Sequence, residues 1–586
     1  MQKPTTTNDP LLSRRFSDFP TLLDAIEYAA KGVRGMNFYS ARGELKEAVP
    51  YSEFRDRSED IGRRLIALGT KAGDRVALIA ETSADFVSFF VGCQYASVLP
   101  VPLPLPTSFG GRGGYVDQLS GQMKSCGVRV VITPDGMKGL ILEATQNLNA
   151  LFVGTPSEFL ANTSPADEVR VPKHDDLAYL QYSSGSTRFP HGVAVTHKSL
   201  MANCHGMGYH GVGVREDDRC VTWLPFYHDM GLVGTLLTSL TCQISTDFLA
   251  TEDFARRPMM WLNLLSANKG TITYSPTFGY DICARRVGPE ALADLDLSHC
   301  RVSGIGGDMI RPGVLIDFAK AFEPAGFKAS SYMASYGLAE CTLAVSFMKF
   351  NRGMVTDKVD ERVLAGGISS ADAEKEYAEN KGINVKEAPN LRDVVNCGKP
   401  LPEYEVEIRD PEGNVLPEKE IGKLFLRGVS VMREYFADPE ATREVLSEDK
   451  WLDTGDMAYL LKGCIYIGGR IKDLIIVNGK NHWPQDIEWA VEQLPGYRNG
   501  DIAAISIPGS GDEEVPTVLV HCRKQTPEDR KELLEIVKEQ ILKNTGITCQ
   551  VILVPPRTLP RTSSGKLSRT KARNKYLSGE LVPLTC

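Results

Sequence analysis

Residues 182–193 read YSSGSTRFPHGV, and the interpretation of the fold starts from this stretch. Small hydroxyl residues surround Gly185, so backbone N–H groups and hydroxyl oxygens could approach phosphate oxygens with little steric obstruction. The stretch is not a P-loop, because G-x-x-x-x-G-K-S/T occurs nowhere in the sequence, and G-x-G-x-x-G is absent as well. Considered alone, it is more often an ordinary Ser/Gly turn, so the neighbouring sequence has to decide between the two.

The stretch lies among short strands that alternate with helices. Leu177–Gln181 leads into it as a strand, and Thr196 is placed to cap the helix that follows. Further out, Ser83–Ala96 reads as an apolar-faced helix capped by Ser83. The other predicted strands are Arg75–Ala80, Val128–Thr133, Thr271–Ser275, Arg301–Ile305 and Ser330–Ser335. Short apolar strands separated by helices predict an α/β fold with a largely parallel sheet.

The C-terminal part of the chain predicts a compact unit of its own. A helix over Pro527–Gly546 carries Leu533, Leu534, Val537 and Ile541 on one face. Strands are predicted at Ile502–Pro508, Thr517–Arg523 and Val551–Val554. We therefore expect a large N-terminal domain of layered α/β subdomains, residues 1–471, and a small, mobile C-terminal α+β domain, residues 472–586.

Composition and charge exclude several classes of protein. The 66 Lys and Arg against 74 Asp and Glu give a net charge of −8, which argues against a nucleic-acid polymer as partner. The 13 cysteines form no C-x-x-C pair, which argues against zinc ribbons and redox pairs. Their odd number and an N-terminus without a signal-like apolar run favour a reducing, cytoplasmic location. The longest charge-free stretch, Phe86–Gly111, contains four prolines, so we expect no membrane span.

One segment differs in charge composition from the rest of the chain. The 45 residues of Lys349–Asp393 contain 17 charged side chains, too many for a buried segment. They predict a surface excursion or flexible insert, with one short helix in its centre at Ala371–Asn380.

The stretch at 182–193 resembles the nucleotide loop of adenylate-forming enzymes, which are the acyl-CoA synthetases, luciferases and adenylation domains of peptide synthetases. Their pattern ends in S-G-S/T-T-G-x-P-K-G, and this sequence departs from it with Arg188 in place of Gly and His191 in place of Lys. An Arg at that point resembles the fatty acyl-AMP ligase branch. The resemblance implies that ATP phosphates are bound by Ser183, Ser184, Gly185, Ser186, Thr187 and Arg188.

Two further segments resemble the catalytic parts of the same family. Trp223–Leu232, WLPFYHDMGL, would place His228 where the α-phosphate meets the substrate carboxylate, although a lone His is usually structural. Pro560–Arg569, PRTSSGKLSR, would bring Lys566 into the site to stabilise the pentavalent phosphorus. His228 and Lys566 are therefore the candidate catalytic residues.

The resemblance also assigns residues to adenosine and metal. Tyr336 in SYGLAECT would stack on adenine, and Glu340 would supply a carboxylate to Mg²⁺. Asp456 in WLDTGDM would hold the ribose hydroxyls, with Arg470 beside it and Asp473 as the hinge. The remaining candidates for nucleotide contact are Gly306, Gly307, Asp308, Ser335, Gly337, Leu338 and Lys472. Glycine turns and surface acids are the alternative interpretation of these segments.

The last set of candidates concerns an apolar tunnel for the acyl chain. Candidates for its lining are Phe226, Met230, Gly231, Thr235, Tyr274 and Phe278. Side chains of these kinds are more often ordinary core.

The family resemblance implies an enzyme that uses ATP and Mg²⁺ to activate a fatty acid as its acyl adenylate, with release of pyrophosphate. The fatty acyl-AMP ligase branch then delivers the acyl group to the phosphopantetheine of a holo acyl carrier protein, or of a carrier domain in a polyketide or peptide synthetase. Its characteristic insertion would correspond here to residues of about 349–387. The alternatives are a fatty acyl-CoA synthetase and a nucleotide-binding relative without catalysis.

Overall fold

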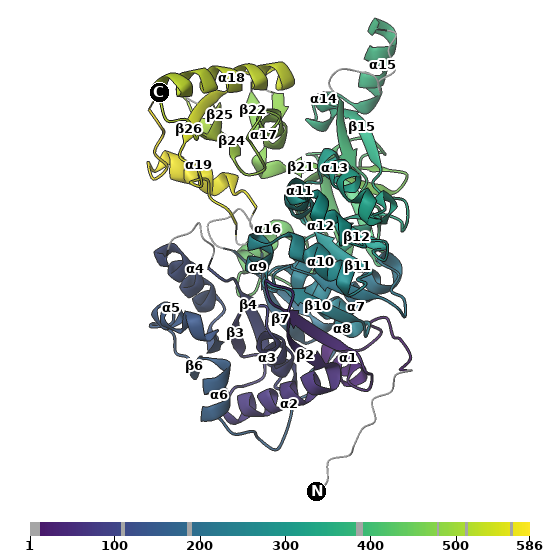
Figure 1. Cartoon of the computed structure of the whole chain (residues 1–586), viewed down its shortest axis with the longest axis vertical. Coiled ribbons are helices and arrows are strands. Elements are labelled where there is room, and N and C mark those ends of the chain that lie inside the picture. Colours follow the sequence, from purple (N-terminus) through teal and green to yellow (C-terminus); the bar gives the residue numbers. More distant parts are fainter. Residues whose placement is uncertain are drawn as a thin grey trace.

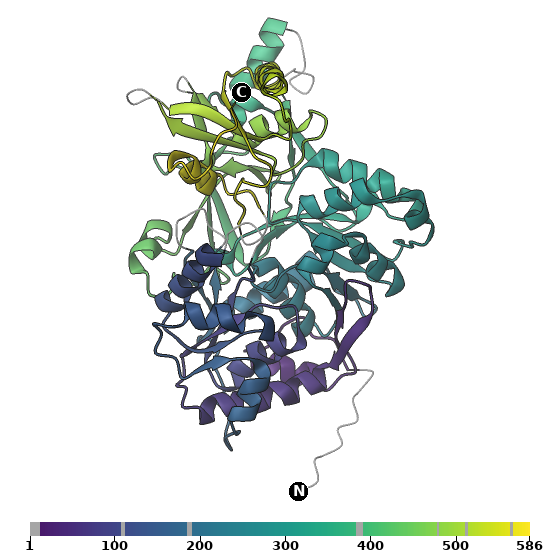
Figure 2. The ribbon, with the colours of Figure 1, turned by 60° about the vertical axis from the view of Figure 1, so that its left-hand side comes forward.

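The computed structural model describes residues 12–106, 112–183, 190–381, 391–477, 480–509, 514–562 and 566–585. The structure consists of a large N-terminal domain of stacked α/β layers and a smaller C-terminal domain above them (Figures 1 and 2). Both parts of the predicted fold class are confirmed. No helix in the described ranges is both long enough and apolar enough to cross a membrane.

The largest sheet has nine strands in the order β17-β14-β13-β12-β11-β9-β10-β1-β2. Their bounds are β1 Gly35–Tyr39, β2 Leu45–Pro50, β9 Arg219–Thr222, β10 Ser245–Leu249, β11 Ile272–Ser275, β12 Val302–Ile305, β13 Tyr332–Gly337, β14 Ala344–Phe347 and β17 Lys399–Pro400. The strands from β1 to β13 pair in parallel, whereas β2, β14 and β17 pair antiparallel at the edges. The largely parallel sheet was predicted from the alternating pattern. The carboxyl ends of its central strands, where open α/β sheets bind ligands, carry most of the candidate residues.

A second, fully parallel sheet has the order β4-β3-β5-β6. It consists of β3 Arg75–Ile79, β4 Leu99–Leu103, β5 Val128–Ile132 and β6 Phe152–Gly154. The helix α3 Ala84–Tyr95 is capped by Ser83, as predicted, and is buried on all sides because it packs between this sheet and the neighbouring helix α2 Tyr51–Ala67. Beside this sheet, β7 Leu177–Tyr182 and β8 Gly192–Thr196 form the antiparallel pair that flanks the stretch at 182–193.

A third sheet leads to the domain boundary. It is antiparallel and consists of β18 Tyr404–Arg409, β19 Gly422–Gly428, β20 Leu452–Leu461 and β21 Cys464–Arg470. One turn of 3₁₀ helix, Ile471–Asp473, follows β21, and the boundary predicted at 471/472 falls in this turn.

The C-terminal domain has a three-stranded sheet of β24 Ile502–Pro508, β25 Glu514–His521 and β26 Gln550–Val554, covered by helices. Its other elements are β22 Ile475–Val477, β23 Lys480–His482, α17 Pro484–Glu492, α18 Pro527–Thr545 and α19 Arg569–Leu577. Helix α18 buries Leu533, Val537 and Ile541 and ends at Gly546, which is left-handed with φ +70°. The apolar face predicted for this helix is the face that packs on the sheet.

The charged segment forms an antiparallel hairpin of β15 Thr356–Asp360 and β16 Leu391–Val395. Between these strands lie α14 Glu361–Leu364 and α15 Ser370–Lys381, so the short helix predicted at 371–380 is confirmed. Figure 1 shows α15 projecting from the body while the hairpin lies next to the C-terminal domain.

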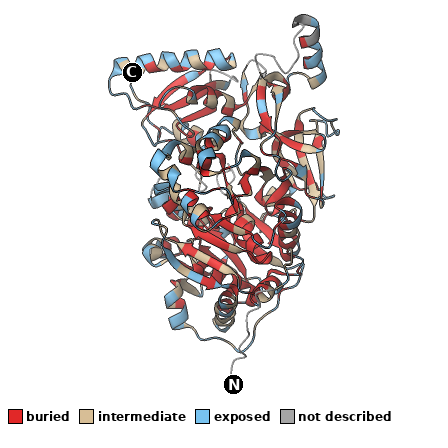
Figure 3. Cartoon of the chain, turned by 45° about the vertical axis from the view of Figure 1, so that its right-hand side comes forward, coloured by how far each residue is buried: buried red, intermediate tan, exposed pale blue. Residues whose placement is uncertain are grey.

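The remaining helices belong to the N-terminal domain and cover its sheets. They are α1 Leu22–Ala29, α4 Arg112–Ser125, α5 Lys138–Ala144, α6 Pro156–Asn162, α7 His197–His205, α8 Thr238–Thr241, α9 Thr251–Arg256, α10 Met259–Ala267, α11 Thr277–Arg286, α12 Pro289–Ala293, α13 Pro312–Phe322 and α16 Pro439–Val445. Buried residues are concentrated in the strands and in the helix faces turned to them, and the exposed residues lie on the outer helix faces (Figure 3).

Candidate active site

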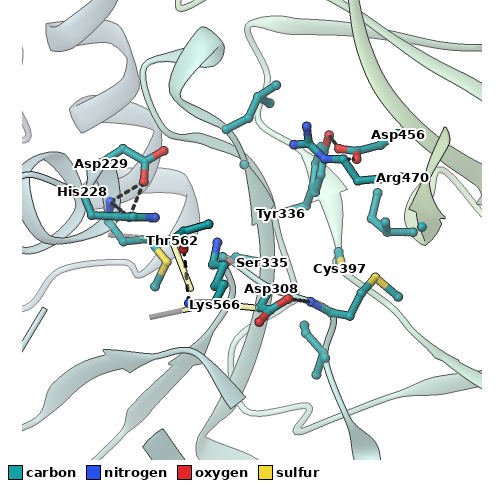
Figure 4. A pocket seen from close by; sticks show the side chains of 18 of the residues that line it. His228, Asp229, Asp308, Ser335, Tyr336, Cys397, Asp456, Arg470, Thr562 and Lys566 are labelled. Atoms are coloured by element: carbon teal, nitrogen blue, oxygen red, sulfur yellow. Dashed lines mark hydrogen bonds and ion pairs between the residues drawn. The ribbon is translucent and has the colours of Figure 1, made fainter. Parts of the chain in front are cut away.

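A cavity of about 390 Å³ lies between the two domains, and both contribute to its lining. The larger domain supplies the ends of β7, β12 and β13 and the loop before Met230, and the smaller one supplies α17 and the segment 566–570. Most of the residues assigned from the sequence are brought together here although they come from distant parts of the chain. Figure 4 draws 18 of the lining residues and labels ten of them.

His228 and Asp229 lie in contact at one wall of the cavity (Figure 4). Nδ1 of His228 lies 2.7 Å from Oδ1 of Asp229, and the same carboxylate oxygen accepts the N–H of Met230 at 2.8 Å. Burial by itself would raise the pKa of Asp229, but His228 and Lys566 outweigh burial and hold that pKa below its ordinary value. Asp229 therefore fixes the orientation of the imidazole and carries a negative charge at neutral pH.

Lys566 lines the same cavity from the C-terminal domain. Its N–H donates to Oγ1 of Thr562 at 3.2 Å, and the N–H of Thr562 donates to its carbonyl at 2.7 Å. These two bonds close a small loop whose residues 563–565 lie outside the described ranges. The charge of Lys566 acts on Asp229 through the cavity, so the C-terminal domain is docked with this lysine facing the His228 wall.

At the opposite wall, Asp456 and Arg470 are ladder partners on β20 and β21. The Nε of Arg470 lies 2.9 Å from Oδ1 of Asp456, and the hydroxyl of Tyr336 donates to Oδ2 at 2.6 Å (Figure 4). The pKa of Arg470 is raised chiefly by Asp456, whereas that of Tyr336 is raised by burial and then by the same carboxylate. The three side chains form a compact polar group suited to hydroxyl ligands.

The ends of β12 and β13 form the floor between the two walls. Gly307 has φ +77°, and a Cβ there would lie 2.5 Å from Sδ of Met230, so this position requires glycine. Ser335 donates its hydroxyl to the carbonyl of Ile305 at 3.2 Å, which ties the two strand ends together. Asp308 is exposed to the cavity, and its Oδ1 accepts the N–H of the next residue at 2.8 Å.

Glu340 faces the cavity, and a tyrosine outside the cavity lining hydrogen-bonds to its carboxylate. Its Oε1 accepts the hydroxyl of buried Tyr435 at 2.8 Å, and the ring of His191 packs on Tyr435 at 4.8 Å. His191 is itself paired with Asp438, Nδ1 to Oδ2 at 3.1 Å. The histidine that replaces the family lysine is therefore a supporting residue beside the loop in this structure.

The donor set around Glu340 fits one kind of metal site. No group of three His, Cys, Asp or Glu side chains that could enclose a metal ion occurs within the described ranges. A single carboxylate suits Mg²⁺ that completes its coordination with phosphate oxygens and water, which is how this ion is usually bound with nucleotides.

An apolar arm extends the cavity away from the polar groups. Its lining consists of Met207, Val212, Gly234, Thr238, Leu343, Ala344 and Phe347, with Met230 and Tyr274 at its inner end. Two of its walls are π-helical, Gly206–Gly211 and Met230–Leu237, a conformation that often accompanies functional sites. The hydroxyl of Thr238 donates to the carbonyl of Val233 at 2.7 Å. Its hydrogen is already used in this bond, so Thr238 adds little unsatisfied polarity to the arm.

Comparison with known proteins agrees with this geometry. Residues 36–436 match the family model described as "AMP-binding enzyme". The chain belongs to this family. Residues 472–585 match a second model, "Disco-interacting protein 2-like, AMP domain". The protein is therefore an adenylate-forming ligase, as the sequence resemblance implied.

Individual relatives of this AMP-binding enzyme span nearly its whole length. A Caulobacter vibrioides protein that is provisionally named an acyl-CoA synthetase is 46% identical over 96% of each chain. A medium-chain-fatty-acid–acyl-carrier-protein ligase from Moorena producens is 30% identical over 96% of each chain. A solved structure from a study of fatty acyl-adenylate ligases from E. coli and L. pneumophila has 42% identity and a TM-score of 0.88, covering 97% of this chain and 100% of the other.

Two of the residues assigned to nucleotide contact, Gly306 and Lys472, do not line the cavity, and five others are not described. Ser184, Gly185, Ser186, Thr187 and Arg188 fall outside the described ranges, whereas Ser183 lines the cavity and donates its N–H to the carbonyl of His191 at 3.0 Å. Lys472 is exposed, because the one-turn helix directs its neighbours Arg470 and Asp473, and not Lys472, to the cavity. Gly306 is buried behind Gly307, against Ser335. Gly337 and Leu338 do line the cavity.

Of the six candidates for an acyl tunnel, Met230 and Tyr274 line the cavity and the other four do not. Phe226 is fully buried and stacks on Phe86 at 5.2 Å, while Phe278 packs edge-on to Trp223 at 5.7 Å. Gly231 lets its helix approach the carbonyl of Pro225, and Thr235 donates to the carbonyl of Gly231 at 2.8 Å. These four belong to the core, which was the alternative left open by the sequence.

Other cavity residues of the enzyme were not found from the sequence. Asp229 could have been, because it follows His228 in the same motif. Trp489 and Phe347 carried no signal, and neither did Tyr435, which bonds to Glu340 without lining the cavity. An isolated aromatic residue looks the same in sequence whether it packs in the core or against a site.

Proposed function

We propose that this adenylate-forming ligase activates a fatty acid as its acyl adenylate and then transfers the acyl group to the phosphopantetheine thiol of a carrier protein. The observation that carries the proposal is one cavity that joins the His228–Asp229–Lys566 group to an apolar arm. A carboxylate at the charged group would leave its alkyl chain in the arm. The relatives named for fatty acids and for a carrier protein support the same substrate class.

In the first half-reaction, a carboxylate oxygen of the fatty acid attacks the α-phosphorus of ATP. The bond from this phosphorus to the oxygen bridging to the β-phosphorus breaks, and pyrophosphate leaves with the electron pair. His228, oriented by Asp229, would hold the carboxylate beside the α-phosphate, and Lys566 would stabilise the charge on the pentavalent phosphorus. The loop from Ser183 to Arg188 would contact the phosphates.

The adenosine would occupy the opposite wall. Asp456 and Arg470 would hold the ribose hydroxyls, Tyr336 would contact the adenine ring, and Gly307 and Asp308 would border the base. Glu340 would hold Mg²⁺ together with the phosphates. When bound, this ion neutralises phosphate charge and so lowers the repulsion between the two anionic reactants.

In the second half-reaction, the thiol sulfur attacks the acyl carbonyl carbon, the bond to the AMP oxygen breaks, and the thiol proton is released to solvent. The inserted hairpin supports acyl transfer to a carrier protein over transfer to free CoA, because the inserted segment belongs to the larger domain and also contacts the smaller one. Trp483 donates Nε1 to the carbonyl of Leu364 at 3.1 Å, and Asn481 donates to the carbonyl of Ala365 at 2.9 Å. These contacts would oppose the rotation of the C-terminal domain that CoA ligation needs.

A fatty acyl-CoA synthetase is the second candidate, and the name of the Caulobacter relative favours it. To distinguish a carrier-protein ligase from a CoA synthetase, purified protein is incubated with ATP, Mg²⁺ and fatty acids of increasing length, with hydroxylamine to trap the adenylate. Mass spectrometry then compares the thioester formed on CoA with that formed on a holo carrier protein. No hydroxamate from any fatty acid would refute the first half-reaction, and turnover with CoA alone would refute the carrier.

Removing the inserted contacts tests the carrier assignment directly. Asp360 and Leu391 are paired across the hairpin, so a deletion of residues 361–387 leaves three residues to connect them. We expect this variant to gain CoA ligation, measured as acyl-CoA formed per acyl adenylate. A matched deletion of residues 370–387 keeps α14 and its contacts with Trp483 and Asn481, and should gain less. Unchanged CoA turnover in a folded 361–387 variant would contradict the carrier assignment.

A further inference from the structure

A second cavity, of about 410 Å³, adjoins the end of the apolar arm. Val212 and Phe347 line both cavities. The lining of the outer cavity includes His210 and the cationic side chains Arg215, Arg301, Lys349 and Lys399, of which Arg301 is paired with Asp218. Arg215 and Arg301 also lie over the ring of Phe350, 5.0 Å and 5.4 Å from its centre.

The wall between the two cavities is a single layer of side chains. Phe347 is the last residue of β14 and is only 9% exposed. Its ring packs directly on Gly211, where a Cβ would lie 2.9 Å from the ring, so the absence of a side chain at Gly211 makes room for it. Val212 follows Gly211 and completes the wall.

The inner arm is narrow where the two π-helices face β14. Gly234 lies opposite Leu343, and a Cβ there would be 3.0 Å from its Cδ2. A larger side chain at Gly234 would therefore fill the arm before its end is reached. Met230, Gly234 and Phe347 all line the inner cavity, and of these three only Phe347 also lines the outer one.

We propose that Phe347, with Val212, is the residue that sets the longest acyl chain the enzyme accepts, by separating the acyl arm from the cationic outer cavity. The inference rests on the proposed fatty-acid substrate. Each methylene that fits the arm adds buried apolar area worth about a fourfold gain in binding. A chain that reaches Phe347 gains nothing further and clashes with the ring. Opening this wall would let longer chains pass into the outer cavity, where a terminal carboxylate would meet the cationic side chains.

The test compares kcat/KM for pyrophosphate release across fatty acids that lengthen in two-carbon steps. Phe347→Ala is expected to move the preferred length to longer chains and to raise kcat/KM at least tenfold for chains beyond the wild-type limit. Gly234→Leu is expected to move it to shorter chains. Phe322→Ala, which removes a fully buried ring from α13, should leave the profile unchanged and controls for general loosening of the core. Phe347→Leu replaces Phe347→Ala if the latter fails to fold.

A second series uses long α,ω-dicarboxylic acids. In Phe347→Ala these should gain more than monocarboxylic acids of equal length, and Lys349→Ala in that background should remove part of the gain. Suppose that the wild-type protein activates fatty acids and that the position-347 and position-234 variants both keep its chain-length profile. That result would overturn this inference while leaving the proposed function intact. Absence of adenylate from every fatty acid with wild-type protein would instead overturn the proposed function.

Discussion

At the scale of single residues, the chemistry depends on three polar side chains that the fold places at one cavity. Asp229 is buried beside His228, and His228 and Lys566 together hold the pKa of its carboxyl below the ordinary value despite burial. The arrangement gives a fixed imidazole and a cation on a short loop, which matches the needs of an in-line attack between two anions.

Lys566→Ala should therefore lower the rate of adenylate formation by about 10²- to 10³-fold, the usual cost of losing one group that stabilises a transition state. KM for the fatty acid should change little, because the apolar arm binds the chain. The measurement is hydroxamate formation at saturating ATP. Lys571→Ala, on the exposed side of α19, is the matched control and should retain full activity. Equal loss in both variants would show a structural effect of removing charge.

At the scale of elements, helix α17 connects the active site to the rest of the molecule. Asp486 lies 3.4 Å from Arg392, and Glu492 lies 2.6 Å from Arg311. Trp489 is placed between these two arginines, 5.2 Å and 5.7 Å from their guanidinium carbons. One face of α17 is therefore held by two arginines of the larger domain, one of them on the inserted hairpin.

Glu492 gives this contact a pH dependence. Burial is the largest influence and, with Glu488 and Asp281, raises its pKa to about 7, although Arg311 opposes the rise. Oε2 of Glu492 lies 2.6 Å from the Arg311 guanidinium, which favours the charged form but does not cancel the effect of burial. From the ordinary value of 4.5 up to about 7, the folded state keeps a proton that the unfolded state has lost. The stability of this region should fall as pH rises through that window.

Glu492→Gln should remove that part of the dependence, on the order of 2 kcal/mol between the two ends of the window. The measurement is amide hydrogen exchange of α17 at several pH values, corrected for intrinsic rates. Glu361 also has its pKa raised to about 7, so only the difference between wild type and variant isolates Glu492. Parallel pH dependences in the two proteins would contradict the assignment.

At the scale of the whole molecule, the active site exists only while the domains are docked. Lys566 and Asp473 come from the end and the beginning of the smaller domain, and Arg569 joins them by pairing with Asp473 at 2.7 Å and with Glu488 at 2.7 Å. Arg569 thus makes the hinge segment and the lysine-bearing segment move as one unit. This unit and α17 line the cavity on the side of the smaller domain.

Arg311→Ala combined with Arg392→Ala should loosen the docked arrangement. We expect a larger radius of gyration in small-angle scattering and slower adenylate formation, since Lys566 would spend less time at the His228 wall. Acyl transfer from added acyl adenylate should be affected less, because it does not need this arrangement. Arg427→Ala, which breaks an exposed pair with Glu405, is the control. An unchanged radius with slowed chemistry would place the effect of the arginines in the cavity and not in docking.

The sequence alone determined the fold class, the parallel sheet, the helix in the inserted segment and the chemical class of the site, because each depends on contiguous residues. Local patterns of this kind can be recognised directly in the sequence: a periodic apolar face, an N-cap such as Ser83 or a run such as WLPFYHDMGL. Only the tertiary structure decided which apolar residues border the acyl arm. Phe226 and Phe347 look alike in sequence, yet one packs inside the core and the other separates two cavities. The electrostatic effect of Lys566 on Asp229, and the contacts of α17 with Arg311 and Arg392, likewise depend on how distant segments pack, which no local pattern encodes.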